Sequence, residues 1–399
     1  MLPASVSGVD PHTEVLVVGA GPAGLAVAAC LRRRGIEATI VDAGEAVGET
    51  WQRRYERLHL HTPRIQSALP GLRMPRRFGR WVAKDDIAHY LRVYARKHGL
   101  EPRFGVEVQR LERNGAGWTA TTGEGVISAQ QVVLATGYSN RPITPSWPGQ
   151  DSYGGEVVHA SRYRDAMPFV GRRVLIVGAG NSGAEIAADL AEQGAAEVRL
   201  AVRTPPNIIP RQLGPIPTTL LAIPMDFLPA WLSDPVNRLL QRLVIGDLTP
   251  YGMPPARSGV VAQQRATNVT PTIDVGLVAA LRAGSVRAVA ALERFEDGRA
   301  VLADGTRLTP DAVIAATGYT TGLAPVVGHL GVLDAHGAPA STGGRVHPHA
   351  PGLRFVGVRS PLKGLLLQIN IDARSAARAI ARELRAGRDA HRRHDSRRL

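Results

Sequence analysis

Two glycine-rich loops constrain this chain more than any other feature of its sequence. They read Gly19-Ala-Gly-Pro-Ala-Gly24 and Gly178-Ala-Gly-Asn-Ser-Gly183, and each lies between a short apolar segment and an alanine-rich segment. Glycines at this spacing permit a tight turn from strand to helix, let the backbone approach a pyrophosphate and allow the helix to pack closely. The sequence therefore predicts two dinucleotide sites, formed by Gly19, Gly21, Pro22, Ala23 and Gly24 and by Gly178, Gly180, Asn181, Ser182 and Gly183.

The first loop belongs to a predicted strand-helix-strand unit that ends in a carboxylate. The pattern predicts a strand over 14–18, a helix over 25–34 and a strand over 38–41, followed by Asp42. A carboxylate at the end of the second strand accepts hydrogen bonds from both ribose hydroxyls and repels a 2′-phosphate. The first site is therefore expected to hold FAD or NAD.

The second loop belongs to a similar unit that ends in a cation. Its predicted strands cover 173–177 and 198–202, its helix covers 184–193, and Arg203 stands where the first unit has its acid. A guanidinium there suits a 2′-phosphate, because it forms charge-assisted hydrogen bonds with the phosphate oxygens. We therefore predict NADPH as the occupant of the second site.

The order of these units predicts the domain organisation. The sequence Ala-Thr-Gly-Tyr follows an apolar segment twice, at 135–138 and 316–319, and a last strand (353–358) and helix (365–384) close the chain. We expect an α/β fold with two Rossmann-like dinucleotide-binding domains, the second inserted into the first. Residues 1–165 and 308–399 are assigned to the FAD-binding domain and 166–307 to the NADPH-binding domain, with a helical insertion over about 205–262.

Further cofactor contacts are expected beside the two loops. For FAD they are Trp51, Val108, Ala135, Thr136, Gly137 and Gln368, and for NADPH they are Thr317 and Gly318. Histidines, cysteines and acids show no metal-ligand spacing, so no metal is predicted.

The positive charge does not indicate a nucleic-acid partner. There are 48 lysines and arginines against 34 acids, a formal charge of +14. The arginines are scattered, apart from a basic tail between Arg382 and Leu399, and no helix-turn-helix, aromatic-basic or zinc-finger pattern accompanies them. Anionic cofactors are the expected partners of this charge, together with a small-molecule substrate.

The cysteine content and the apolar segments exclude further classes of protein. The one cysteine, Cys30, lies in the helix after the first loop and excludes enzymes that relay electrons through a cysteine pair. No signal peptide is visible, which predicts a cytoplasmic location. The longest apolar region, 218–232, is interrupted by prolines and an acid, so no transmembrane helix is predicted. Peripheral membrane contact through the aliphatic stretch 213–243 and the oligomeric state both stay open.

The segment between the loops carries a family resemblance. Tyr153-Gly-Gly155-Glu-Val-Val-His159-Ala-Ser-Arg-Tyr163 resembles the fingerprint of class B flavin-dependent monooxygenases, with Tyr153 in place of the usual phenylalanine. Trp51-Gln52, Leu60-His61, Pro63-Arg64 and the stretch 270–276 are similar to the YUCCA branch of the flavin-containing monooxygenases. The likeness covers roughly 14–384. Asp42 replaces the family's more usual glutamate, which is a mild change for FAD binding.

The resemblance implies that NADPH reduces FAD and that the reduced flavin reacts with O2 to give a C4a-(hydro)peroxyflavin, which oxygenates a small organic substrate. N- or S-oxygenation and YUCCA-like oxidative decarboxylation of a 2-oxo acid, such as indole-3-pyruvate, are the leading reactions. Baeyer–Villiger oxygenation and an FAD-dependent NADPH oxidase or dehydrogenase are the alternatives.

The resemblance also implies roles for individual residues. His61 is a candidate for contact with the flavin or the nicotinamide, although a packed polar histidine is an equal interpretation. Arg64 is a second catalytic candidate and, with Arg211 and Lys363, a possible partner for a substrate anion. Gly155, His159 and Tyr163 are expected to link the two domains, with His159 holding the hinge rather than transferring a proton.

Overall fold

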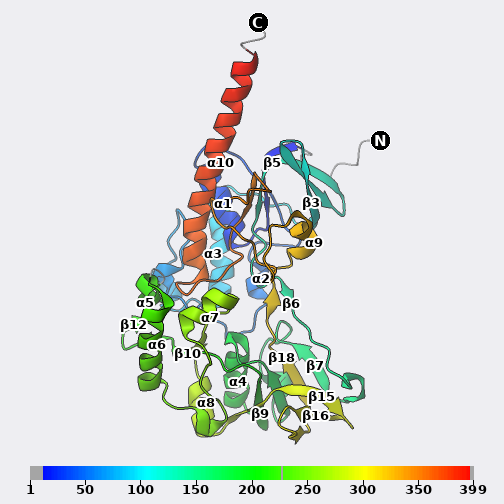
Figure 1. Ribbon diagram of the computed structural model, residues 1–399, viewed down its shortest axis with the longest axis vertical. Coiled ribbons are helices and arrows are strands. Elements are labelled where there is room, and N and C mark those ends of the chain that lie inside the picture. Colours follow the sequence, from blue (N-terminus) through cyan, green and yellow to red (C-terminus); the bar gives the residue numbers. More distant parts are fainter. Residues whose placement is uncertain (1–11, 226–227, 396–399) are drawn as a thin grey trace.

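The computed structural model describes residues 12–225 and 228–395 of the chain. Two sheet-containing halves lie one above the other along the long axis, and a helical segment drawn in green lies beside their junction (Figure 1). The chain enters the second half after residue 142 and returns to the first near residue 319, so segments far apart in sequence build the first half.

The first half contains a six-stranded sheet with a parallel and an antiparallel part. Parallel pairing joins β2 (Thr39–Val41), β1 (His12–Val18), the end of β5 (Gly125–Leu134) and β20 (Leu353–Phe355). The start of β5 pairs antiparallel with β4 (Gly117–Thr122), which pairs with β3 (Val108–Asn114).

The side chains of β1 point alternately to the two faces of the sheet, and each face has its own hydrophobic core. Val15 and Val17 face a core shared with α1 (Pro22–Arg32), α3 (Lys84–Lys97) and α10 (Leu365–Asp395). Leu16 and Val18 face the other side, against residues of β3 to β5 and the short helix α9 (Ala324–Val327). Successive side chains of a strand point to opposite faces of its sheet, so β1 is buried on both faces.

The second half is built on a fully parallel sheet. Its strands, in spatial order, are β14 (Val286–Ala290), β9 (Glu197–Val202), β8 (Arg173–Val177), β18 (Ala312–Ala315) and β7 (Glu156–His159). Helices α4 (Asn181–Glu192) and α8 (Leu277–Ala283) cover one face. The antiparallel strands β15 (Leu292–Glu296), β16 (Arg299–Leu302) and β17 (Arg307–Leu308) cover the other.

This pairing departs from the predicted boundaries at 165 and 308. β7 and β18 pair with each other, and β18 pairs with β8, so Glu156–His159 and Ala312–Ala315 lie in the second sheet. The prediction had placed both segments with the FAD-binding domain. The two halves repeat the same arrangement. The first Ala-Thr-Gly segment follows β5, which pairs with β1 before the first glycine loop, and the second follows β18, which pairs with β8 before the second loop. The second copy therefore belongs to the second sheet.

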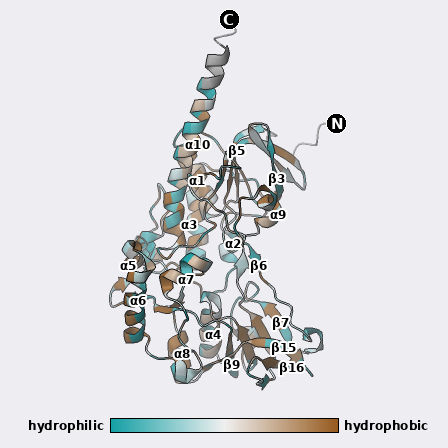
Figure 2. Ribbon diagram, in the orientation of Figure 1, coloured by the Kyte–Doolittle hydropathy of each residue, from teal (hydrophilic) through white to brown (hydrophobic). Residues whose placement is uncertain are grey.

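The described part of the segment predicted to be a helical insertion, together with the residues just after it, contains three helices and short strands. The helices are α5 (Thr218–Met225), α6 (Ala230–Val244) and α7 (Val260–Thr267). β10 (Ile208–Pro210) pairs with β13 (Thr272–Asp274), and β11 (Gln212–Leu213) pairs with β12 (Ile216–Pro217). Brown hydrophobic residues recur along α6 at the edge of the molecule (Figure 2).

Small elements complete the chain. They are α2 (Glu49–Gln52), the two-residue strands β6 (Arg141–Pro142) and β19 (Tyr319–Thr320), and six 3-10 turns at Arg64–Gln66, Arg76–Phe78, Gln150–Ser152, Met167–Phe169, Thr249–Tyr251 and Gly328–Leu330. Within the described residues, no helix is both long and apolar enough to cross a membrane.

Candidate functional site

The two glycine loops adopt the same backbone geometry. Gly19 and Gly178 have φ angles of +110° and +111°, which L-residues rarely adopt. A Cβ on Gly19 would lie 2.5 Å from the carbonyl oxygen of Ala135, and one on Gly178 would lie 2.5 Å from that of Ala316. Only glycine therefore fits where each loop passes the neighbouring strand.

The last and middle glycines of each loop have different surroundings. A Cβ on Gly24 or Gly183 would overlap the carbonyl oxygen of the first glycine of its own loop. Gly21 and Gly180 face open space, since no protein atom lies within 4 Å of a Cβ built there. These two residues are the N-caps of α1 and α4, and neither helix has a side-chain cap at this end. Helix N–H groups beside open space fit a pyrophosphate, so the geometry of both loops is compatible with the predicted dinucleotides.

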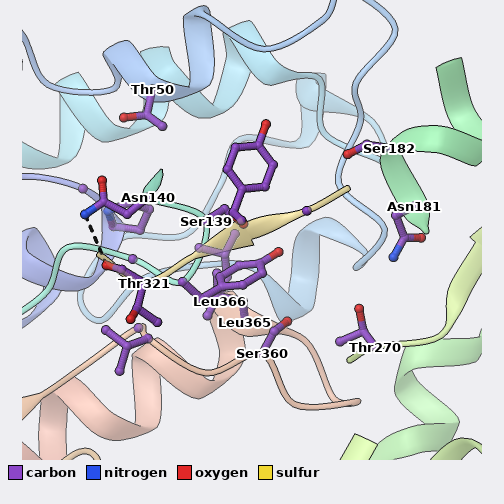
Figure 3. A pocket seen from close by; sticks show the side chains of 18 of the residues that line it. Thr50, Ser139, Asn140, Asn181, Ser182, Thr270, Thr321, Ser360, Leu365 and Leu366 are labelled. Atoms are coloured by element: carbon purple, nitrogen blue, oxygen red, sulfur yellow. Dashed lines mark hydrogen bonds between the residues drawn. The ribbon is translucent and has the colours of Figure 1, made fainter. Parts of the chain in front are cut away.

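Both loops open onto one cavity of about 1360 Å³. Among the predicted cofactor residues it is lined by Gly19, Gly21, Pro22, Ala23, Asp42, Trp51, Val108, Ala135, Thr136, Gly137, Gly180, Asn181, Ser182 and Gly318. In Figure 3, Asn181 and Ser182 lie on one side of the pocket, and Asn140 and Thr321, joined by a hydrogen bond, lie on the other. The cavity therefore brings the surroundings of both loops together.

Other predicted cofactor residues lie outside the cavity lining. Gly24, Gly178 and Gly183 pack the loops, as their neighbours require. Gln368 donates to Asp372 within α10, and the Thr317 hydroxyl donates to the carbonyl of Ile143. Arg203 is exposed at the end of β9, and its contact with NADPH stays a prediction.

Asp42 occupies the predicted place at the edge of the cavity. Its Oδ2 accepts the backbone N–H of Ala20 at 2.6 Å, and its Oδ1 accepts that of Gly44 at 2.7 Å. Each carboxylate oxygen can accept more than one hydrogen bond, so the side chain is held in place while lone pairs remain for ribose hydroxyls. This arrangement fits the FAD role predicted for it.

His61 lines the cavity and contacts an acid that the sequence interpretation missed. Its Nε2 lies 2.9 Å from Oε1 of Glu185, a residue of α4 that is 2% exposed. His61 Nδ1 and Thr136 Oγ1 are both buried without a hydrogen-bond partner. Two such atoms in the wall of one cavity fit a polar ligand that supplies their partners.

The structure places Arg64 away from the cavity. Its Nε donates to the carbonyl of Gly79 at 3.1 Å and its Nη1 to that of Met74 at 3.0 Å. The side chain therefore fastens the loop that follows His61. Its predicted catalytic role receives no support from its position.

His159 connects the second sheet to the strand pair between the halves. Its Nε2 lies 3.2 Å from the carbonyl oxygen of Gly318, and the N–H of Ser161 donates to its Nδ1 at 3.0 Å. Burial lowers the pKa of His159 below its ordinary value. A neutral ring with its proton on Nε2 satisfies both contacts. These contacts are compatible with the linking role predicted for His159, which stays a prediction.

The other fingerprint residues pack within the second half. The Tyr163 hydroxyl donates to Asp189 at 2.6 Å, and its ring stacks on Phe169. Gly155 lies against the ring of Tyr153, where a Cβ would clash. Neither Tyr163 nor Gly155 lines the cavity.

The side of the cavity next to α5 to α7 is mainly apolar. Its lining includes Leu213, Leu221, Ala222, Leu240, Val260, Val261 and Leu362. The helices are fastened to the first half by Gln66, which accepts from the Thr219 hydroxyl at 3.1 Å and donates to the carbonyl of Lys363 at 2.5 Å. This part of the cavity suits an apolar substrate.

Comparisons with known proteins agree with this geometry. Residues 16–210 match the family model of pyridine nucleotide-disulphide oxidoreductases. The chain is 33% identical over 309 residues to indole-3-pyruvate monooxygenase YUCCA1 of Oryza sativa subsp. japonica, which covers 76% of this chain and 76% of the relative. The chain belongs to the class B flavin-dependent monooxygenases, in their YUCCA-like branch.

Solved structures of flavin monooxygenases share the fold. A flavin-containing monooxygenase from Stenotrophomonas maltophilia matches with a TM-score of 0.70 and 26% identity, over 94% of this chain and 99% of that chain. Cyclohexanone monooxygenase with bound ε-caprolactone matches with a TM-score of 0.71 over 94% of this chain and 89% of that chain, and its 20% identity shows the fold alone.

Family membership establishes the cofactors and the reaction class. This flavin monooxygenase uses FAD and NADPH and catalyses flavin-dependent oxygenation. The single cysteine, Cys30, is buried in α1, and burial raises the pKa of its thiol. Disulphide chemistry, which the name of the matching family model mentions, therefore has no cysteine pair in this chain.

Proposed function

We propose that this flavin monooxygenase oxygenates a small apolar organic acid, with oxidative decarboxylation of a 2-oxo acid as its main reaction. The observation that carries the oxygenation is the single cavity onto which both glycine loops open. The substrate class is supported by the rice relative, whose name specifies indole-3-pyruvate, and by the half-buried guanidinium of Arg211 beside the apolar part of the cavity.

The two cofactors are assigned to the loops by the charges that follow them. Asp42 favours FAD at the first loop, and Arg203 favours the 2′-phosphate of NADPH at the second. The halves are then an FAD-binding domain and an NADPH-binding domain inserted into it, as the two chain crossings near residues 142 and 319 support.

The residues of the chain bind and orient the cofactors and keep water away. Bound FAD, reduced by NADPH, supplies the electrons that activate O2. The N-termini of α1 and α4 hold the phosphates, and Asp42 holds a ribose. His159 fixes the junction between the halves through Gly318. The helices α5 to α7 cover the apolar side, which limits the escape of activated oxygen as hydrogen peroxide.

Arg211 adjoins the cavity without being part of its lining, and it is the residue proposed to attract a substrate carboxylate. It lies between Pro210 and Leu213, which line the cavity, and burial lowers its pKa to about 10. Its Nη2 donates to the carbonyl of Leu60 at 2.7 Å, while its Nε is buried without a partner. A substrate carboxylate would offset the cost of this incompletely paired charge.

A 2-oxo acid fits a cavity that has an apolar side and guanidiniums around it, those of Arg53, Arg54, Arg141 and Arg164 in the lining and that of Arg211 beside it. In the proposed reaction, the 2-oxo acid, O2, NADPH and a proton give the carboxylic acid shorter by one carbon, CO2, NADP⁺ and water. The bond between the oxo carbon and the carboxylate breaks, and one atom of O2 stays in the shortened acid. The second atom leaves as water.

N- or S-oxygenation is the second candidate, because the apolar lining also suits an uncharged amine or thioether. Indole-3-pyruvate, phenylpyruvate, thioanisole, N,N-dimethylaniline and cyclohexanone distinguish the reactions by O2 uptake, CO2 release and product mass. We expect CO2 and the shortened acid from the 2-oxo acids. An oxygenated amine or thioether without CO2 release supports the second candidate, and hydrogen peroxide as the only product contradicts both.

Variants at Arg211 test the carboxylate contact. We expect Arg211→Met to raise KM for a 2-oxo acid about tenfold, the scale of one charge-assisted hydrogen bond. Arg211→Lys keeps the charge and should recover part of this loss. Equal KM values in all three proteins would place the carboxylate elsewhere.

A further inference from the structure

A buried acid on the helix of the second loop meets a histidine from the first half. Glu185 lies one turn into α4, and His61 lies in the loop before the turn Arg64–Gln66. The 2.9 Å contact between Glu185 Oε1 and His61 Nε2 therefore crosses the junction between the halves.

The two ring nitrogens of His61 have different surroundings. Nε2 lies 2.9 Å from Glu185 Oε1, a close contact in which that oxygen accepts no aligned hydrogen bond, and Nδ1 is buried in the wall of the cavity without a partner. A carboxylate stabilises a ring proton on the nitrogen that faces it. In the neutral ring, Nδ1 then carries a lone pair and is a hydrogen-bond acceptor.

A phenol and two guanidiniums lie near the carboxylate of Glu185. The hydroxyl of Tyr55 lies close to Glu185. Burial, and after it the charge of this carboxylate, raises the pKa of Tyr55 well above its ordinary value, so the phenol keeps its proton. The guanidiniums of Arg211 and Arg57 add positive charge nearby. The carboxylate of Glu185 therefore lies among a phenol, two guanidiniums and the ring of His61.

Helix α4 also connects Glu185 to the second loop. Ser182, three residues earlier, lines the cavity and lies close to the Tyr55 hydroxyl. In Figure 3, Asn181 and Ser182 mark this end of α4 at the side of the pocket. A ligand that binds the N-terminus of α4 therefore touches the element that carries Glu185.

We propose that Glu185 is a positioning residue that acts through His61. Its carboxylate holds the ring across the junction with Nδ1 as an acceptor toward the cavity, and this contact couples binding at the second loop to the ring of the first half. The proposal rests on the FAD- and NADPH-dependent activity and does not depend on the substrate class.

The ring tautomer is the first test, and it requires no turnover. In FAD-loaded protein with ¹⁵N-labelled histidine, two-bond N–H correlation spectra identify the nitrogen that carries the proton, and His61→Gln identifies the signal. We expect the proton on Nε2 in the wild-type protein. Glu185→Gln, whose amide can accept or donate, should give a mixture of tautomers. A wild-type proton on Nδ1, or an unchanged tautomer in E185Q, overturns the proposal.

NADP⁺ binding is the second test. We expect NADP⁺ to shift the Nδ1 signal of the wild-type protein. In calorimetric titrations, E185Q should raise the dissociation constant of NADP⁺ about fivefold, the scale of one hydrogen bond, with unchanged FAD content. An Nδ1 signal that ignores NADP⁺, together with equal dissociation constants, contradicts the coupling.

Asp189→Asn is the matched control. Asp189 lies one turn further along α4, is also buried, and accepts from Tyr163 without contacting His61. D189N should leave the His61 tautomer and its response to NADP⁺ unchanged, and an equal effect of both variants would overturn a specific role for Glu185. If E185Q does not retain FAD, the wild-type tautomer and its response to NADP⁺ decide the matter. These tests require no turnover of a 2-oxo acid. The proposal for Glu185 and the proposed substrate class can therefore be contradicted independently of each other.

Discussion

At the residue scale, local chemistry made the glycine loops and Asp42 predictable. A loop, its helix and the acid after the next strand lie within about twenty-five residues of one another, so spacing alone relates them to one ligand. Glu185 has no such signal, because an acid in an alanine-rich helix also fits a solvent-exposed face. Its contact with His61 arises only when the two halves come together. For Arg64 the opposite happened: the sequence suggested a catalytic role because the residue is charged, whereas in the structure its guanidinium donates to two backbone carbonyls.

The two kinds of glycine in the second loop should respond differently to alanine. Gly180→Ala meets no protein atom within 4 Å, so we expect an unchanged melting temperature and a KM for NADPH raised about tenfold by the methyl group in the phosphate space. Gly183→Ala overlaps the carbonyl of Gly178 and should lower the melting temperature by several degrees. Thermal unfolding and NADPH titration check both variants, and similar melting temperatures would contradict the difference.

Replacement of Arg203 should change cofactor preference. Arg203→Ser removes the cation assigned to the 2′-phosphate, so KM for NADPH should rise about tenfold while KM for NADH stays the same. Steady-state rates with both cofactors measure this. A parallel rise for NADH would show that Arg203 does not recognise the phosphate.

At the element scale, the sequence predicted where most of the strands lie, but it did not predict which strands pair with one another. The apolar segments before the loops and after 311 are strands, but parallel partners come from distant parts of the chain and leave no local mark. This is why β7 and β18 were assigned to the first half. The proline-broken stretch after 205 was predicted as helical, and the helices α5 to α7 lie within or next to it, although Pro235 lies inside α6.

The connection from β7 to β19 through His159 should weaken in acid. Because burial lowers the pKa of His159 in the folded protein, the unfolded chain binds a proton near pH 6.5 that the folded site does not bind. Its contribution to stability is complete above pH 6.5 and is lost as the pH falls below that value. Between pH 7.5 and 5.5 we therefore expect this residue to lower the free energy of unfolding.

Denaturant unfolding at both pH values measures that loss. His159→Gln keeps a donor for Gly318 and should show a smaller difference between the two pH values. Burial also lowers the pKa of His98, so part of the pH dependence should remain in this variant. An identical pH dependence in both proteins would contradict the role of His159.

At the scale of the whole molecule, the exposed face of α6 is the surface on which the open question of peripheral membrane contact can be tested. Trp231, Leu239 and Leu243 are 76%, 58% and 74% exposed, and the exposed arginines 238 and 242 accompany them. Asn237 and Leu240 of the same helix line the cavity. Apolar and basic side chains on one helix fit the surface of an anionic bilayer.

We expect the protein to float with vesicles that contain phosphatidylglycerol and to float less with vesicles of phosphatidylcholine alone. The triple variant Trp231→Ser, Leu239→Ser and Leu243→Ser should lose this binding and keep its FAD. Equal flotation of the variant, or none of the wild-type protein, would contradict a membrane role for α6.

The short strands β6 and β19 have a consequence for engineering. Tyr319 pairs with Pro142, and the N–H of Ile143 donates to the carbonyl of Gly318 at 3.0 Å, so the chain leaves the first half and returns to it at adjacent points. Everything between 143 and 318 is thus a cassette with neighbouring ends. That cassette can be exchanged with the matching part of a relative through two splice points, both within one pair of hydrogen-bonded strands.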